Sequence, residues 1–263
     1  MNESDLKDTQ FYNSSKTYLE ILEQRSNSDY VTILGALQSY AIDGTVLDYG
    51  CGVGLLSMLL AKNGFIVTGA DISEQFIQSA NRKFGGLPSI TFDVINGLPL
   101  RYPDGSFQNI VTSCVLEHCV GIDAILLEFK RLLKPNGILV IETPNMLSPL
   151  ARLKLIAGRL TGQRKTFHRY GTPAFFFTSS YYLIKKMILR KPEFIYVKPN
   201  YQTFTEADED VSYLSNHLDY LFFLRSQDFE VLELSRNTGI IRKFISTYLP
   251  YIAGGVMIVA RKK

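Results

Sequence analysis

The sequence predicts an α/β domain in which a mostly parallel sheet is covered by helices on both faces. Apolar, β-branched segments alternate with helical segments from residue 45 to residue 145, which implies crossover connections between parallel strands. Turn sequences such as PDGS and KPNG separate these segments. With 263 residues, of which 46% are hydrophobic and 20% charged, the chain can bury a core of this size.

The expected elements follow from these patterns in chain order. Helices are expected at 18–24, 30–40, 55–63, 73–84 and 122–133, the fourth of them capped by Ser73. Strands are expected at 46–49, 65–71, 89–94, 106–115 and 137–144. Beyond residue 210 we expect a helix from Ser215, its cap, to Gln227, and two strands at 228–236 and 254–262.

The charge is unevenly distributed along the chain. Residues 146–200 contain eleven basic residues and one acid, whereas the remainder contains 17 basic and 24 acidic residues. The same segment is rich in aromatic residues and has no clean periodicity. A basic segment is therefore inserted into an acidic body.

The cysteines and the termini suggest a cytoplasmic protein. Cys51, Cys114 and Cys119 are odd in number and have neither disulfide nor zinc spacing, which favours a reducing compartment. The polar, acidic first ten residues do not resemble a signal peptide. The longest uncharged run, 244–260, contains proline and a glycine pair and is short for a membrane span, so we expect a loop and a terminal strand.

Residues 46–54, VLDYGCGVG, place a glycine at every second position directly after a strand. Glycine inside a regular element costs roughly 0.5–1 kcal/mol relative to alanine, so three of them need a reason. A ligand that approaches backbone amides at the carboxyl end of the strand supplies one. The dinucleotide pattern G-x-G-x-x-G fails here, because Leu55 stands where its third glycine belongs.

This stretch resembles motif I of the class I S-adenosylmethionine-dependent methyltransferases, close to (V/I)LD-hydrophobic-GCG-x-G. GLPLRYPDGSFQNIVTSCVLEHC and RLLKPNGILVIETPN also resemble segments of that family, with Gln108 and Asn136 as departures. Asn136 tolerates a left-handed backbone, so its turn is expected to survive. The resemblance covers residues 45–145 and implies a Rossmann-like three-layer sandwich. Its seven-stranded sheet is expected to have the last strand antiparallel, between the fifth and the sixth.

The resemblance also implies S-adenosylmethionine as cofactor, S-adenosylhomocysteine as product, and a set of cofactor-binding residues. Asp71 is expected to accept hydrogen bonds from the two ribose hydroxyls, as a carboxylate can. Asp93 is expected to face the adenine amino group, and Asp48 to hold the glycine loop. The other expected cofactor-binding residues are Gly50, Cys51, Gly52, Gly54, Ile72, Val94, Ser113 and Val115. No cluster of metal ligands is evident in the sequence.

Two histidines are candidate catalytic bases, because imidazole titrates near neutral pH. His118 follows the fourth strand in VLEHC, where positioning the loop is the alternative role, and His168 lies in the basic insert. His217 is interpreted as a surface residue in the first turn of its helix. Tyr12 and Tyr18 belong either to a lid over the cofactor or to ordinary helix packing.

The basic insert follows the fifth strand, where this fold commonly carries acceptor recognition. Leu150, Leu153, Ile156 and Leu160 lie roughly on one face of an expected helix. Three interpretations stay open: a lid packed on the sheet domain, a site for an anionic acceptor, and a peripheral membrane contact through residues 146–165.

We expect one domain, residues 1–263, with four parts: an N-terminal helical lid (1–44), a cofactor-binding core (45–145), an acceptor-recognition insert (146–210) and the C-terminal strands 6 and 7 (211–263). The expected reaction is methyl transfer to a small-molecule acceptor. The favoured acceptor atom is an oxygen of a saccharide, a lipid-linked molecule or another metabolite. The basic insert favours an acceptor that is anionic or lipid-linked. In-line attack on a sulfonium methyl group depends on proximity and orientation.

Two rival functions use the same features. One is a non-catalytic subunit that binds S-adenosylmethionine. The other is an RNA or DNA methyltransferase that uses the basic insert, although no nucleic acid is expected because the fourth strand ends in SCVLEH rather than in a [DNS]-P-P-[FYW] motif. The expected location is the cytoplasm, with peripheral contact at the inner membrane face as the alternative.

Overall fold

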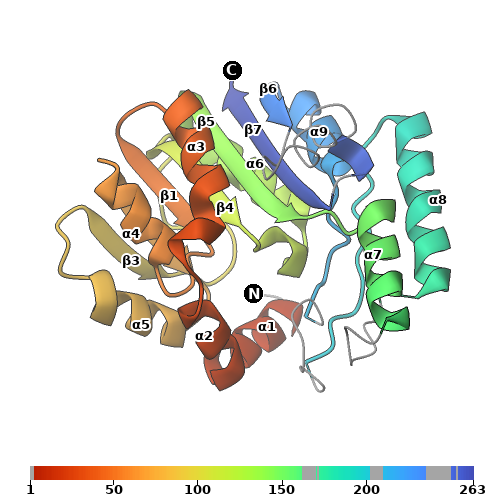
Figure 1. Ribbon diagram of the computed structural model, residues 1–263. Coiled ribbons are helices and arrows are strands. Elements are labelled where there is room, and N and C mark those ends of the chain that lie inside the picture. Colours follow the sequence, from red (N-terminus) through yellow and green to blue (C-terminus); the bar gives the residue numbers. More distant parts are fainter. Residues whose placement is uncertain (1–2, 162–169, 171, 202–209, 235–249, 253) are drawn as a thin grey trace. The chain divides into compact units, whose positions relative to one another are not determined.

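The computed structural model describes residues 3–161, 170, 172–201, 210–234, 250–252 and 254–263 (Figure 1). It divides into two compact units. The first unit comprises Met1–Val115, Asp123–Ile141 and Val259–Lys263, and the second comprises Leu116–Ile122 and Glu142–Ile258.

The strands form one seven-stranded sheet in the order β3-β2-β1-β4-β5-β7-β6. It is mostly parallel with the last strands antiparallel, and β7 lies between β5 and β6, as the sequence predicts. The strands are β1 (Thr45–Tyr49), β2 (Ile66–Asp71), β3 (Ile90–Val94), β4 (Phe107–Ser113), β5 (Leu133–Pro144), β6 (Phe229–Leu234) and β7 (Gly255–Lys262).

Strand β5 begins earlier than expected. We expected it to start at Gly137, but it starts at Leu133 and continues through the KPNG sequence. Asn136 has a φ of +64°, so the left-handed conformation expected for this residue is confirmed.

In the first unit, β1 pairs in parallel with β2 on one side and with β4 on the other, and β2 pairs in parallel with β3. Tyr49 lies opposite Ala70, and Asp71 lies opposite Val94. The carboxyl ends of β1, β2 and β3 are therefore level, and their last residues gather at one edge of the sheet.

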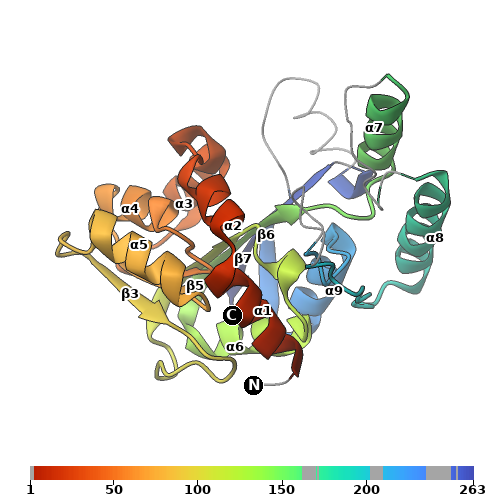
Figure 2. The same ribbon diagram turned by 90° about the horizontal axis from the view of Figure 1, so that it is seen from below.

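The helices of the first unit cover both faces of these strands. The helices α3 (Val31–Tyr40), α4 (Leu55–Lys62) and α5 (Glu74–Phe84) lie on one face, and α6 (Ile122–Leu132) lies on the other (Figures 1 and 2). Helix α5 buries Phe76, Ile77 and Ala80 against the sheet. The Ser73 side chain accepts a hydrogen bond from the Phe76 amide, which confirms the predicted cap.

The N-terminal helices α1 (Glu3–Ser14) and α2 (Lys16–Glu23) are attached to the start of α5. A third short helix, η1 (Asn27–Tyr30), leads into α3. The Asn13 Oδ1 atom accepts a hydrogen bond from the Glu74 amide at 2.8 Å, and Gln75 Nε2 donates to the Tyr12 carbonyl at 2.7 Å. The rings of Tyr12, Tyr18 and Phe76 pack together, and Tyr12 is buried. Helix packing therefore accounts for both tyrosines, one of the two interpretations left open above.

The second unit contains most of the basic insert, which forms two helices: the first is the expected helix that carries Leu150 and Leu153, and the second forms where the sequence shows no clean periodicity. These are α7 (Pro149–Leu160) and α8 (Pro173–Leu189), followed by α9 (His217–Ser226). Short helical turns lie at η2 (Leu116–His118) and η4 (Pro250–Ile252). Its apolar core consists of Met146, Leu147, Tyr170, Leu183, Val211, Leu214 and Leu218.

Two expectations about α9 are wrong. Asn216, not Ser215, caps the helix through its side chain, because the Ser215 hydroxyl instead donates to the Pro144 carbonyl at 2.5 Å. His217 is not a surface residue: only 1% of it is exposed, and its ring lies edge-on to Tyr251. The helix is enclosed on nearly all sides, so position in the first turn does not imply exposure.

No helix among the described residues is long and apolar enough to cross a membrane. The expected strand at the C-terminal end of the 244–260 run is present as the start of β7. Residues 244–249, the first part of that run, lie outside the described residues.

Candidate cofactor site

The glycine loop between β1 and α4 folds back onto the end of β2. The amides of Gly50 and Cys51 both donate to the Ala70 carbonyl, at 2.7 and 3.1 Å. Gly50, Gly52 and Gly54 have φ values of +76°, +52° and +80°. Residues with side chains rarely adopt these angles, so the loop conformation itself requires glycine.

Side chains of this chain lie against all three glycines. A Cβ atom at Gly50 would stand 2.3 Å from Val115 Cγ2, and one at Gly54 would stand 2.7 Å from Phe92 Cζ. At Gly52 the neighbour is Leu22 Cδ1 of α2, at 3.2 Å. The reason expected for these glycines is the close approach of a ligand, but the packing of the chain already requires glycine at positions 50 and 54.

Asp71, at the end of β2, is held by two backbone amides. Its Oδ2 atom accepts from the Gly52 amide and its Oδ1 atom from the Ser73 amide, both at 2.9 Å. Burial raises the pKa of this carboxyl to about 6, although these amide hydrogen bonds act in the opposite direction. Each carboxylate oxygen keeps lone-pair capacity for a further donor, which is the arrangement that two adjacent hydroxyl groups need.

Asp48 is the next-to-last residue of β1, directly before the loop, and its side chain faces α4. Its Oδ2 atom accepts a hydrogen bond from the Ser57 hydroxyl at 2.6 Å, and only 2% of the residue is exposed. Burial, with a smaller contribution from Asp71, raises the pKa of the Asp48 carboxyl to about 7. Asp48 therefore connects the end of β1 to the first turns of α4, in keeping with the loop-holding role expected for it.

Asp93 and Val94 end β3 beside Asp71, and both are exposed. Tyr102 donates its hydroxyl to Asp93 Oδ2 at 2.8 Å, and burial together with this bond raises the pKa of the tyrosine. The ring of Tyr102 packs edge-on against Phe107. Tyr102 thus orients the Asp93 carboxylate, a role that no pattern in the sequence indicated.

The other expected cofactor-binding residues of the first unit lie at the same edge. Cys51 is buried, and burial raises the pKa of its thiol well above the usual value. Ile72, Ser113 and Val115 are half-buried and lie at or just after the ends of β2 and β4. All eleven expected cofactor residues, from Asp48 to Val115, therefore belong to the first unit and lie near the carboxyl ends of β1 to β4.

Arg25 joins this group from the end of α2. Its guanidinium Nη1 atom lies 3.4 Å from the Tyr30 hydroxyl, and the side chain is half-buried. Burial opposes its charge, but Tyr30 and Cys114 raise its pKa above the usual value. Arg25 is the only arginine before residue 44, which is the signal that could have identified it.

His118 lies in the second unit between two buried carboxylates. Its Nδ1 atom is 3.2 Å from Asp210 Oδ2, and its Nε2 atom is 3.7 Å from Glu117 Oε1. Glu117 also accepts a hydrogen bond from the Thr143 hydroxyl at 2.7 Å. Asp210 was not singled out in the sequence, because nothing in its neighbourhood there connects it with VLEHC. His168, the other candidate base, lies outside the described residues.

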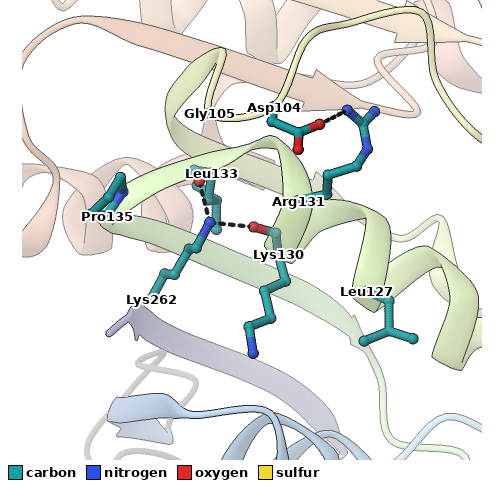
Figure 3. A pocket seen from close by; sticks show the side chains of 8 residues that line it. All are labelled: Asp104, Gly105, Leu127, Lys130, Arg131, Leu133, Pro135 and Lys262. Atoms are coloured by element: carbon teal, nitrogen blue, oxygen red, sulfur yellow. Dashed lines mark hydrogen bonds and ion pairs between the residues drawn. The ribbon is translucent and has the colours of Figure 1, made fainter.

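A shallow pocket in the first unit lies elsewhere, beside the starts of β4 and β5 (Figure 3). Lys262 Nζ donates there to the carbonyls of Lys130 and Leu133, at 2.7 and 2.6 Å, and Arg131 pairs with Asp104 (Figure 3). The other lining residues are Gly105, Leu127 and Pro135. Because ligands in open α/β sheets bind at the carboxyl ends of the strands, this pocket is not the candidate cofactor site.

Comparison with known proteins agrees with this location. Residues 47–141 match the family model described as a methyltransferase domain. The chain is 36% identical over 125 residues to 2-methyl-6-phytyl-1,4-hydroquinone methyltransferase of Synechocystis sp., covering 46% of this chain and 39% of that protein. It is 38% identical over 96 residues to a demethylmenaquinone methyltransferase of Tropheryma whipplei, covering 36% of this chain and 40% of that protein. The chain thus matches less than half the length of these curated relatives.

Solved structures of similar fold cover more of the chain at lower identity. An S-adenosylmethionine-dependent methyltransferase from Mesorhizobium loti has a TM-score of 0.57 and 17% identity, covering 89% of this chain and 99% of that one. The [4+2]-cyclase SpnF has a TM-score of 0.54 and 18% identity, covering 89% and 81%. At such identities the likeness establishes the fold alone, and the cyclase shows that this fold also carries other reactions.

The family match over residues 47–141 coincides with the glycine loop and with the strand ends that carry Asp71 and Asp93. This chain therefore carries a methyltransferase domain of the class I S-adenosylmethionine-dependent family, and S-adenosylmethionine is the cofactor of that domain.

Proposed function

We propose that this chain transfers the methyl group of S-adenosylmethionine to an oxygen of a small lipid-linked acceptor, with a hydroquinone or phenol ring as the first class to test. The observation that carries the proposal is the Asp71 carboxylate, fixed by two amides at the end of β2 beside the glycine loop. The acceptor class is supported by the names of the relatives, which include a phytyl-hydroquinone methyltransferase and a ubiquinone biosynthesis O-methyltransferase.

Three side chains of the first unit each bind a different part of the cofactor. Asp71 accepts hydrogen bonds from the two ribose hydroxyls, since its oxygens are already oriented by the Gly52 and Ser73 amides. Asp93, held by Tyr102, accepts from the adenine amino group. Arg25 pairs with the carboxylate of the methionine part, because a half-buried guanidinium is stabilised by an anion.

The chemical step is an in-line displacement at the methyl carbon. The acceptor oxygen forms a bond to that carbon, the carbon–sulfur bond breaks, and its electron pair stays on sulfur as a neutral thioether. His118 accepts the proton that the acceptor hydroxyl loses. Asp210 and Glu117, on either side of the imidazole, stabilise the imidazolium that results.

Calorimetric titration with two ligands tests the cofactor assignment. Both S-adenosylhomocysteine and 5′-methylthioadenosine contain the adenosine ribose, but only S-adenosylhomocysteine contains the amino-acid carboxylate. Asp71→Asn is expected to weaken both ligands by about tenfold or more, which is about 1.4 kcal/mol or more. Arg25→Met is expected to weaken only S-adenosylhomocysteine to that extent. Arg82→Met, an exposed arginine on α5, is the matched control and should change neither.

If Arg25→Met weakens the affinity for both ligands equally, Arg25 does not bind the amino-acid carboxylate. The assignment of Asp71 to the ribose would then still stand. Unchanged binding in Asp71→Asn would remove the proposed cofactor site. If the wild type binds S-adenosylhomocysteine but methylates no phenolic, quinol or saccharide acceptor from labelled S-adenosylmethionine, the chain is the non-catalytic binding subunit instead.

The role of His118 requires a turnover measurement. His118→Gln is expected to lower kcat for a hydroxyl acceptor by about a hundredfold while leaving the affinity for S-adenosylhomocysteine unchanged. Asp210→Asn should have a smaller effect of the same kind, because it acts through the imidazole. A loss of cofactor affinity in either variant would indicate a structural role for these residues.

A further inference from the structure

Helix α8 exposes a row of large apolar side chains. Phe177, Tyr181, Ile184 and Ile188 are 70%, 60%, 56% and 73% exposed. Their spacing of four, three and four residues places them on one side of the helix. We call these four residues the apolar stripe.

The opposite side of α8 is the buried one. Ser179, Leu183 and Lys186 are buried there. Lys186 Nζ donates to Asp219 Oδ1 of α9 at 2.7 Å and to the Glu193 carbonyl, and the Lys186 and Asp219 side chains are fully enclosed. Turning the helix so that the stripe faces inward would break this buried ion pair. The exposure of the stripe is therefore fixed by the fold.

Helix α7 packs beside α8 and adds further exposed apolar surface. Arg152 lies between the two helices, with its guanidinium 5.6 Å from the centre of the Phe175 ring. Of the large apolar side chains that are exposed in the described part of the chain, half lie on these two helices: Leu150, Leu153, Leu160, Phe177, Tyr181, Ile184, Met187, Ile188 and Leu189. Concentrated apolar exposure of this kind marks an interaction surface.

The charges around this surface are mostly positive, and Glu193, the nearest acid after α8, is paired with Lys185 at 2.7 Å. Neither α7 nor α8 contains an acidic residue, and Lys154, Arg190 and Lys191 are exposed on or directly after them. In a two-fold dimer formed through this face, the same cations would face their own copies and repel. An anionic lipid surface instead offers a hydrocarbon boundary for the stripe and headgroup charges for the lysines and arginine.

We propose that the apolar stripe of α8 docks this chain onto an anionic lipid bilayer. The helix lies in the plane of the interface, with Phe177, Ile184 and Ile188 at the acyl boundary. Tyr181 places its ring at the same depth and its hydroxyl among the headgroups. The contact goes beyond the proposed methyl transfer and does not depend on it, although a bilayer is where a lipid-linked acceptor resides.

The absence of tryptophan from the chain allows a site-specific measurement. Phe177→Trp introduces a single tryptophan into the stripe, and Leu87→Trp introduces one at an exposed apolar position of the first unit. With vesicles of phosphatidylcholine and phosphatidylglycerol, the tryptophan fluorescence of the Phe177→Trp variant should shift to the blue and be quenched by lipids brominated on the acyl chain. The Leu87→Trp variant should show neither change, and vesicles of phosphatidylcholine alone should produce a much weaker response in both.

Co-sedimentation with the same vesicles, without cofactor or acceptor, measures the affinity. Ile184→Glu with Ile188→Glu is expected to weaken the partition by about tenfold or more, and Lys191→Glu to weaken it less. Val31→Glu, an exposed valine at the start of α3, is the matched control and should sediment as the wild type does.

Three results would overturn the proposal. The first is a wild-type chain that does not sediment with anionic vesicles. The second is a double variant that binds them as well as the wild type. The third is light scattering that shows a wild-type dimer which the double variant dissociates, since the stripe would then join two copies. None of these measurements uses turnover, so their failure is distinguishable from failure of the proposed methyl transfer.

Discussion

Replacing Asp48 with asparagine tests the electrostatics of the loop most directly. Asp48 is 2% exposed and accepts a hydrogen bond from the Ser57 hydroxyl at 2.6 Å. Burial raises the pKa of its carboxyl from 3.8 to about 7. Asparagine has nearly the same shape and its side-chain oxygen can still accept from Ser57, but it does not titrate.

The pKa difference sets the size of the effect. In the unfolded chain the carboxyl loses its proton near pH 3.8, whereas in the folded chain it keeps the proton until about pH 7. Between these values the folded state binds more protons, so the free energy of unfolding falls as the pH rises. The fall is about 1.4 kcal/mol per pH unit, or about 4 kcal/mol over the whole window.

Urea unfolding followed by far-ultraviolet circular dichroism measures this, at several pH values between about 4.5 and 8. The free energy of unfolding of Asp48→Asn minus that of the wild type is expected to rise with pH and to level off above about pH 7. A change in the free energy of unfolding that the amide itself causes is the same at every pH, so it does not affect how the difference changes with pH. Ser57→Ala removes the donor that lowers the Asp48 pKa, so the fall in its stability should extend to a higher pH than in the wild type.

Parallel stability curves for Asp48→Asn and the wild type would refute the reasoning. They would mean that Asp48 is ionised in the folded chain at all these pH values. Its burial would then be offset by charges or solvent around the loop.

The remaining predictions concern packing and buried charge. Gly54→Ala is expected to cost about 2–4 kcal/mol of unfolding free energy, because its Cβ meets the Phe92 ring and φ is +80°. Gly64→Ala has φ +92° but open space and should cost only about 1 kcal/mol, so equal losses in urea unfolding would contradict the clash. Lys186→Met is expected to cost about 3 kcal/mol by leaving the buried carboxylate opposite it unpaired, whereas Lys185→Met should leave stability nearly unchanged. Burial lowers the pKa of His217 from 6.5 to about 3, so below about pH 6.5 the unfolded chain binds a proton at this histidine that the folded chain does not. The free energy of unfolding of the wild type therefore falls on acidification. His217→Phe lacks this titration, and its free energy of unfolding should fall by about 2 kcal/mol less than that of the wild type between about pH 6.5 and about pH 5.

The cofactor half of the site is predictable from sequence because its parts are local. The glycine loop directly follows β1, the cap at Ser73 is three residues before the amide that it accepts from, and Asn136 occupies its own left-handed turn. Alternation of strands and helices then implies a parallel sheet, which brings the ends of neighbouring strands together. Asp71 and Asp93 are placed by this rule without any knowledge of side-chain packing.

Other parts of the site depend on contacts between segments that are distant in the chain. Asn13 caps α5 from 61 residues away, and Arg25 lies close enough to Cys114, directly after β4, for that thiol to raise its pKa. Asp210 stands beside His118 although no pattern connects the two segments. Such pairs are set by how helices pack, and the local spacing of residues carries no information about that.

The amino-acid sequence by itself determined the fold class, the order of the elements and the residues at the carboxyl ends of β2 and β3, because each follows from periodicity and turn chemistry within a short window. The tertiary structure alone decided which side of each helix is buried in the basic insert. On α8 the buried pair of Lys186 and Asp219 turns a lysine inward and the apolar stripe outward. A row of apolar residues on one side of a helix is usually its buried side, but not on α8, because a buried charge requires its partner whatever the neighbouring side chains are.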